Sequence, residues 1–180
     1  MIGIVQGTDG RQHDAMDEGD DLGRQIAETL KGVQQTAAAA ESLTGGNVSA
    51  GLSAIEGASD WFVGGVVAYA SEVKFDLLGV DRGPVVNAET ARQMATGAAR
   101  LLHADFAVAT TGVGGPGPQE GRPEGTVFIA VATPSECTAE EYAFGGDPSE
   151  IIEQATRQAV RDLAAAVTGA TVPSDNLSTA

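Results

Sequence analysis

Three segments of the chain combine residue types that can do chemistry, and the first is Glu-Ser-Leu-Thr-Gly-Gly at 41–46. It follows a short apolar run and precedes a predicted helix. The hydroxyls of Ser42 and Thr44 are therefore expected where backbone N–H groups can also bind an anion or an oxyanion. A serine in front of a helix is also a common cap. By itself, the segment predicts either a nucleophile or a helix cap.

The second segment brings together Tyr69, at the end of a predicted strand, and Lys74, in the helix that follows. Lysine occurs only at positions 31 and 74, and its retention at 74 favours a function. A solvated lysine on a helix face is the alternative. The spacing differs from the Tyr-x-x-x-Lys pair of short-chain reductases, and no Gly-x-Gly-x-x-Gly opening precedes it.

The third segment is the glycine-rich stretch Thr-Thr-Gly-Val-Gly-Gly-Pro-Gly at 110–117. Glycines allow backbone N–H groups to approach a phosphate or a carboxamide closely. The stretch lacks the Gly-Lys-Ser/Thr ending of a P-loop, which disfavours hydrolysis of nucleoside triphosphates. A purely structural turn is the alternative.

The composition argues against several classes of function. The 180 residues include 25 acidic and 10 basic side chains, which gives a net charge of −15. Such a surface repels phosphate backbones and anionic lipids, so we expect no nucleic-acid partner and no membrane partner. The lone Cys137 excludes an internal disulfide, and with only His13 and His103 beside it no zinc site of the usual kind is expected. We therefore expect chemistry without a metal or a cofactor.

The scarcity of lysine beside so many acids is typical of proteins from a high-salt cytoplasm, where molar salt shortens the Debye length to roughly 3 Å. A halophilic source is our hypothesis, with an ordinary acidic cytosolic protein as the alternative. The sequence shows neither a signal-peptide pattern nor an apolar run of membrane-spanning length. We expect a soluble, cytoplasmic protein.

Apolar periodicity predicts alternating helices and strands. Expected helices cover 22–31, 48–55, 72–78, 87–102 (capped by Asn87) and 152–166, and expected strands cover 36–40, 62–69, 105–111, 126–133 and 139–144. This alternation predicts an α/β fold, an α/β/α sandwich with a mixed central sheet, in a single domain at 21–170. Residues 1–20 are expected to form a flexible acidic leader and residues 171–180 a disordered tail.

Taken together and in this order, the segments resemble the CinA C-terminal domain family over about residues 22–167. The resemblance is carried by AESLTGG at 40–46, the Trp61-Phe62 pair, GGVVAY at 64–69, Glu72 and Lys74, LGV at 78–80, residues 86–91, TGVGGP at 111–116, GTV at 125–127 and FGGD at 144–147. It implies a cofactor-independent hydrolase of the pyridine nucleotide cycle, which serves NAD salvage. This amidohydrolase would convert nicotinamide mononucleotide into nicotinate mononucleotide and ammonia. It also implies a small-molecule pyridine nucleotide as the partner and a homo-oligomer as the assembly.

The resemblance assigns Ser42 as the nucleophile, Lys74 as the general base and Tyr69 as a residue that relays or positions the proton. A Ser–Lys pair needs a neutral lysine, which burial provides by lowering its pKa, and the start of the helix after 44–46 is expected to stabilise the oxyanion. The residues that it implies in substrate binding are Glu41, Thr44, Gly45, Gly46, Thr111, Gly112, Gly114, Gly115 and Arg122.

The chain departs from the family pattern at three places. Leu43 follows the serine in place of the usual cysteine, and Arg122-Pro123-Glu124 replaces Lys-Pro-Val. Two arginines expected to hold a substrate phosphate are replaced at Asp147-Pro148 and Ile152. Arg122 and Arg157 are candidate substitutes. A non-catalytic, ligand-binding or regulatory module that has lost phosphate recognition is therefore the alternative function.

Overall fold

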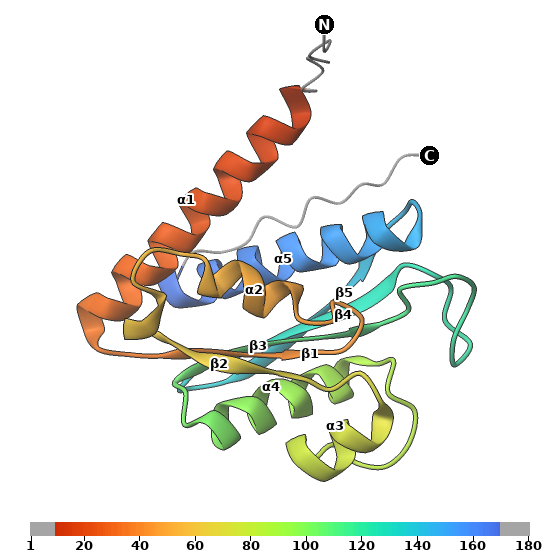
Figure 1. Ribbon diagram of the computed structural model, residues 1–180. Coiled ribbons are helices and arrows are strands. Elements are labelled where there is room, and N and C mark those ends of the chain that lie inside the picture. The colour runs from red at the N-terminus through yellow and green to blue at the C-terminus, as the bar shows by residue number, and fades with distance from the viewer. Residues whose placement is uncertain (1–9, 170–180) are drawn as a thin grey trace, which may run out of the picture.

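A mixed sheet of five strands lies between two layers of helices in the computed structural model, which describes residues 10–169 (Figure 1). The strands are β1 (Ala37–Glu41), β2 (Phe62–Val67), β3 (Phe106–Gly112), β4 (Thr126–Ala132) and β5 (Cys137–Ala143), in the spatial order β2-β1-β3-β4-β5. Strand β1 pairs in parallel with β2 and β3, whereas β4 runs antiparallel to both β3 and β5. The predicted α/β/α sandwich with a mixed sheet is confirmed.

The helices divide between the two faces of the sheet (Figure 1). Helices α1 (Gly10–Val33), α2 (Asn47–Ser53) and α5 (Pro148–Thr168) cover one face, and α3 (Ser71–Leu78) and α4 (Ala88–Leu102) cover the other. A short 3₁₀ turn, Ala58–Asp60, leads into β2. Each layer encloses its own apolar core against the sheet.

Strand β1 joins the two cores. Ala37 and Ala39 pack toward α1, α2 and α5, while Ala38 and Ala40 pack toward α3 and α4. Four alanines are poor strand formers on their own. Strands on both sides supply ladder partners for β1, and burial of both faces favours small apolar residues, so the tertiary context sets the conformation. The carboxyl end of this strand carries Glu41 directly into Ser42.

The starts of two helices differ most from the sequence prediction. Helix α1 begins at Gly10 rather than at Leu22, so residues 10–20, expected within the leader, are helical. Apolar periodicity marks only the part of a helix that packs against the core. A helix that has already formed can extend beyond that part, because each added residue gains a backbone hydrogen bond. Helix α5 begins at Pro148 rather than at residue 152, and its buried isoleucine is Ile151. The expectations for residues 1–9 and 171–180 fall outside the described residues.

Within residues 10–169, no helix combines the length and apolar character that crossing a membrane requires. The same residues contain no group of three or more His, Cys, Asp or Glu side chains placed to hold a metal ion.

A buried carboxyl on α5 is expected to make stability depend on pH. Asp162 is 9% exposed and accepts hydrogen bonds from the Tyr142 hydroxyl, at 2.9 Å, and from Gln158 Nε2, at 2.7 Å. Burial raises the pKa of Asp162 from 3.8 to about 6, although these two donors oppose the shift. The folded state therefore binds this proton more tightly than the unfolded state does. The stabilisation that protonated Asp162 gives the fold is present below pH 4 and is lost as pH rises through about 6.

We therefore predict that Asp162→Asn stabilises the protein at neutral pH but not at pH 4, by up to about 3 kcal/mol. Denaturant unfolding of wild type and variant between pH 4 and pH 7 measures the difference. Glu28→Gln, at an exposed position of α1, is the matched control and should show no such trend. A difference between Asp162→Asn and wild type that stays constant with pH would contradict the assignment.

Candidate active site

A pocket of about 320 Å³ lies where β1, β2 and β3 end. Ligand sites of open α/β sheets lie at the carboxyl ends of parallel strands. The residues that line the pocket are Ser42, Leu43, Tyr69, Ser71, Lys74, Val85, Val86, Thr111, Gly112, Val113, Gly114, Gly115, Pro116, Gly117, Pro118, Gln119, Pro148 and Ile152.

The three segments singled out in the sequence meet at this pocket. Ser42 directly follows β1, Lys74 lies in the first half of α3, and Thr111 lies near the end of β3. Ser42 is 9% exposed and Lys74 only 1%. A hydroxyl and an amine from different elements of the chain thus line the same pocket.

Lys74 is held by two backbone carbonyl groups. Its Nζ donates to the oxygen of Ala68 at 2.7 Å and to that of Tyr69 at 3.1 Å. Burial lowers the pKa of Lys74 below its usual 10.5, against an upward influence from the charge of Glu120. A neutral amine has two N–H groups, enough for both carbonyls, and one lone pair that can accept a proton. This environment suits a general base.

Tyr69 contacts Lys74 through its backbone. The group that contacts Lys74 is the backbone carbonyl of Tyr69, while its side chain lines the pocket and is 72% exposed. A proton-relaying role for the phenol remains a prediction.

Glu41 is fully buried beneath the pocket and does not line it. Its carboxylate accepts hydrogen bonds from the backbone N–H groups of Gly46, Val48 and Ser49, at 2.8–3.0 Å. It also accepts from the hydroxyls of Thr44, at 2.7 Å, and Ser49, at 2.6 Å. Glu41 therefore ties the end of β1 to the start of α2.

This arrangement corrects the expected source of the oxyanion site. The N–H groups at the start of α2 already donate to Glu41, so they are not available to a substrate oxyanion. Gly45 and Gly46 have φ values of 60° and 109°, which turn the backbone so that these groups meet the carboxylate. Thr44, Gly45 and Gly46 do not line the pocket. Local sequence could not reveal this because a carboxylate can bind a substrate or a helix start equally well.

The glycine-rich segment forms one wall of the pocket. Gly112, Gly114 and Gly115 line it, as predicted from the sequence. Gly115 has φ 84°, and a Cβ at this position would come within 2.2 Å of a Glu124 carboxylate oxygen. Only glycine fits such a conformation beside such a neighbour.

The arginines considered for phosphate binding lie elsewhere. The Arg122 guanidinium contacts Glu141 at 3.3 Å and stacks 5.4 Å from the centre of the Phe128 ring, and Arg157 pairs with Glu153. Neither arginine lines the pocket. Among the described lining residues Lys74 is the only cation, and Pro148 and Ile152 are apolar.

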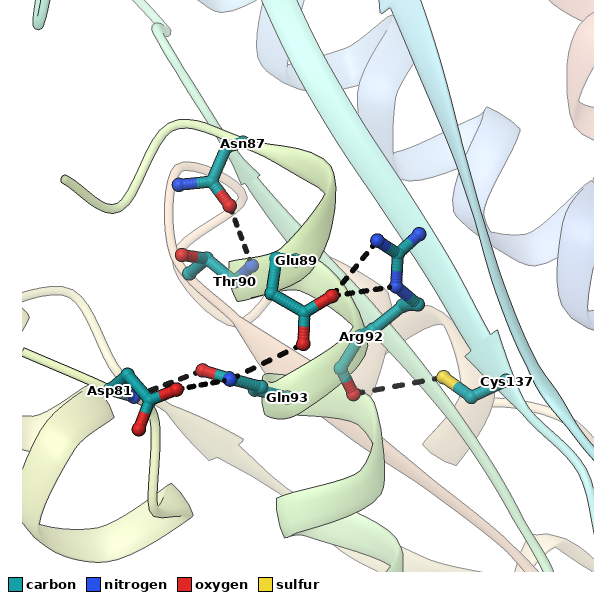
Figure 2. A network of polar contacts seen from close by, with 7 residues as sticks. All are labelled: Asp81, Asn87, Glu89, Thr90, Arg92, Gln93 and Cys137. Atoms are coloured by element: carbon teal, nitrogen blue, oxygen red, sulfur yellow. Dashed lines mark hydrogen bonds and ion pairs between the residues drawn. The ribbon is translucent and has the colours of Figure 1, made fainter. Parts of the chain in front are cut away.

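Another wall of the pocket is formed by Val85 and Val86, in the segment 81–87 that links α3 to α4. Figure 2 shows how this segment is fixed to α4. The Asn87 side chain caps the helix by accepting from the Thr90 N–H at 2.8 Å, as predicted. Gln93 exchanges hydrogen bonds with Asp81 at 2.8 and 2.9 Å. In the sequence, the signals in this segment were the Asn87 cap and the block 86–91 that carries the family resemblance, whereas nothing marked Val85.

Comparisons with known proteins identify the family of this chain. Residues 19–167 match the family described as the CinA C-terminal domain. A CinA-like protein of Synechococcus sp. (strain RCC307) is 44% identical over 142 residues, which are 76% of this chain and 34% of that protein. A CinA-like protein of Geobacter metallireducens is 39% identical over 145 residues, 77% of this chain and 35% of that protein. The chain thus spans about a third of the length of these curated relatives.

Solved structures of the same superfamily share the fold. The crystal structure of the competence-damaged protein (CinA) superfamily protein from Klebsiella pneumoniae 700603 has a TM-score of 0.79 and 30% sequence identity, covering 84% of this chain and 98% of that one. The superfamily protein from Escherichia coli has the same TM-score and identity over 89% of this chain and 94% of that one. By sequence and by fold, the chain belongs to the CinA C-terminal domain family.

Proposed function

We propose that this chain is an amidohydrolase that deamidates nicotinamide mononucleotide, with Ser42 as nucleophile and Lys74 as general base. The observation that carries the proposal is the burial of Lys74 in the same pocket as Ser42, with two carbonyl acceptors for its N–H groups and a lowered pKa. A serine hydroxyl is a weak nucleophile at neutral pH and needs a neighbouring base.

The proposed reaction has two halves. Ser42 Oγ attacks the carboxamide carbon while its proton passes to Lys74 Nζ. Collapse of the tetrahedral intermediate breaks the C–N bond, and Lys74 returns the proton to the departing nitrogen, which leaves as ammonia. Water then attacks the nicotinoyl ester, with Lys74 taking its proton, and the carboxylate product leaves with Ser42 restored.

The oxyanion needs donors that α2 does not offer. Gly114 and Gly115 line the pocket with backbone exposed to it, so we assign this role to their N–H groups.

One observation favours a second candidate function. Pro148 and Ile152 present apolar surface to the pocket, and Lys74 is the only cation in its described lining. A phosphate would thus lack the bidentate partner that arginine provides. A non-catalytic CinA-like module that binds a different ligand or serves regulation is the alternative.

Ammonia release from nicotinamide mononucleotide by the purified chain tests the proposal. We expect ammonia and nicotinate mononucleotide in equal amounts. The assay belongs in molar KCl as well as dilute buffer, because salt screens an anionic substrate from a protein of net charge −15. Binding of the nucleotide without product, or no binding at all, would favour the alternative.

The rate should also depend on pH in a way that reports on Lys74. Because the base must be neutral, we predict that kcat/KM rises with pH to a plateau. The midpoint of the rise should lie below 10.5. Lys31→Met, which removes the other lysine, should keep this profile. A profile that falls as pH rises from roughly 6 to 9 would exclude a neutral lysine as the base.

A further inference from the structure

Glu120 lies at the tip of a hairpin beside the pocket. Gln119 and Arg122 exchange both backbone hydrogen bonds, at 3.0 and 2.9 Å, around Glu120 and Gly121. The φ values of these two residues are 51° and 74°, which is the geometry of a two-residue primed turn. Glycine suits this conformation, whereas glutamate is uncommon in it. A specific contact made by the side chain would explain why position 120 is a glutamate despite its positive φ.

The Glu120 side chain makes such a contact across the pocket rim. Its Oε2 accepts from the backbone N–H groups of Val85 and Val86, at 2.8 Å each. Both valines line the pocket, and so does Gln119, the neighbour of Glu120 in the chain. The carboxylate therefore joins the hairpin that follows the glycine-rich segment to the wall formed by Val85 and Val86.

A second hydrogen bond holds Val85 in place. The buried Thr111 hydroxyl donates to the Val85 carbonyl at 2.8 Å. Val85 is thus held by the end of β3 on one side and by the hairpin on the other. Of these two bonds, only the one to Glu120 involves an ionisable group.

Glu120 is also the acidic group that acts on Lys74. Its negative charge raises the pKa of Lys74, while the larger influence of burial lowers it. The other acids of α3, Glu72 and Asp76, pair with Arg82 at 2.8 and 2.9 Å. Glu41, on the side of β1, is occupied by the start of α2.

We propose that Glu120 is a positioning residue that closes the pocket by fastening the hairpin to Val85 and Val86 beside the Ser42–Lys74 pair. This inference rests on the proposed function for its catalytic consequence, whereas the fastening itself can be measured without a substrate. The same carboxylate restrains how readily Lys74 gives up its proton. Glu120 thus couples the shape of the pocket to the state of the base.

Two variants separate these contributions. Glu120→Ala removes both the acceptor and the charge, while Glu120→Gln keeps an amide oxygen that can accept from the two N–H groups. Hydrogen exchange of the peptide containing Val85 and Val86 should accelerate at least about tenfold in Glu120→Ala and much less in Glu120→Gln. Glu136→Gln, at an exposed position of the β4–β5 turn, is the matched control and should change nothing.

The effect of the Glu120 charge is measured on the protonation of Lys74. Acylation of Lys74 by an amine reagent, followed by peptide mass spectrometry across pH, reports its neutral fraction. In Glu120→Gln the midpoint should move to lower pH, because the charge that raises the pKa of Lys74 is removed, and the rising limb of kcat/KM should move with it. Glu120→Ala should lower kcat/KM about tenfold or more, with partial recovery in Glu120→Gln.

Unchanged exchange at Val85 and Val86 in Glu120→Ala would overturn the proposal, as would an acylation midpoint in Glu120→Gln equal to that of wild type. These measurements do not need turnover. If both change as expected and no amide is hydrolysed, the positioning of the pocket by Glu120 stands and the proposed function fails. If hydrolysis occurs but neither measurement changes, the proposed function stands and Glu120 has no such role.

Discussion

Replacing Ser42 with alanine is expected to reduce amide hydrolysis by about 10³-fold or more, with little change in stability. Loss of a catalytic nucleophile costs several orders of magnitude because no other group can form the covalent intermediate. Ser42 is 9% exposed at the pocket, and removing one hydroxyl there leaves only a small space. Ammonia release under saturating nicotinamide mononucleotide measures the effect.

The control for Ser42→Ala is Ser53→Ala, which removes an exposed hydroxyl from the end of α2. It should retain wild-type activity. Ser42→Ala should still bind the substrate, as measured by calorimetry, because the pocket is intact. Activity of Ser42→Ala within a few-fold of wild type would refute the nucleophile and direct attention to a water-mediated reaction or to the non-catalytic alternative.

Replacing Glu41 with alanine is expected to produce the largest loss of stability, on the order of 3–5 kcal/mol. The substitution leaves three backbone N–H groups and two hydroxyls without the carboxylate that they contact. Buried donors that lose their acceptor keep the full cost of desolvation. Denaturant unfolding measures the change, and the melting temperature should fall by roughly 10 °C for a domain of this size.

Glu41→Gln distinguishes the charge from the shape. Its amide oxygen can accept some of the five hydrogen bonds, but its NH₂ group would face donors, so we expect a substantial loss here as well. Glu56→Ala, at an exposed position, should leave stability within about 0.5 kcal/mol of wild type. Glu41→Ala with wild-type stability would mean that Glu41 does not hold the start of α2, and a substrate role would return as its explanation.

Much of the fold followed from apolar patterning. The alternation of buried stretches with amphipathic helices predicted the layers, and the Asn87 cap was placed correctly. Boundaries were less accurate, as with the start of α1 at Gly10, because helix elongation beyond the packed turns leaves no apolar signal. The alanine run of β1 formed a strand through its two neighbours and not through its own propensity.

The candidate site was predictable in part. Ser42, Lys74 and the glycines at 112, 114 and 115 do share the pocket. Arg122 was expected there and instead contacts Glu141 and Phe128, because a long cationic side chain takes whichever acid and ring its strand neighbours present. Neither Val85 nor Val86 was predicted to line the pocket, although Val86 begins the block 86–91 that carries the family resemblance.

By itself, the sequence determined the class of fold, the order of its elements and the residues available for chemistry, because burial patterns repeat within short windows of the chain. Only the tertiary structure decided what the carboxylates do. Glu41 binds the start of α2, and Glu120 binds a backbone 35 residues away in sequence. The partner of a polar side chain is set by which distant segment lies within about 3 Å, and that distance exists only once the sheet and its two helical layers have assembled.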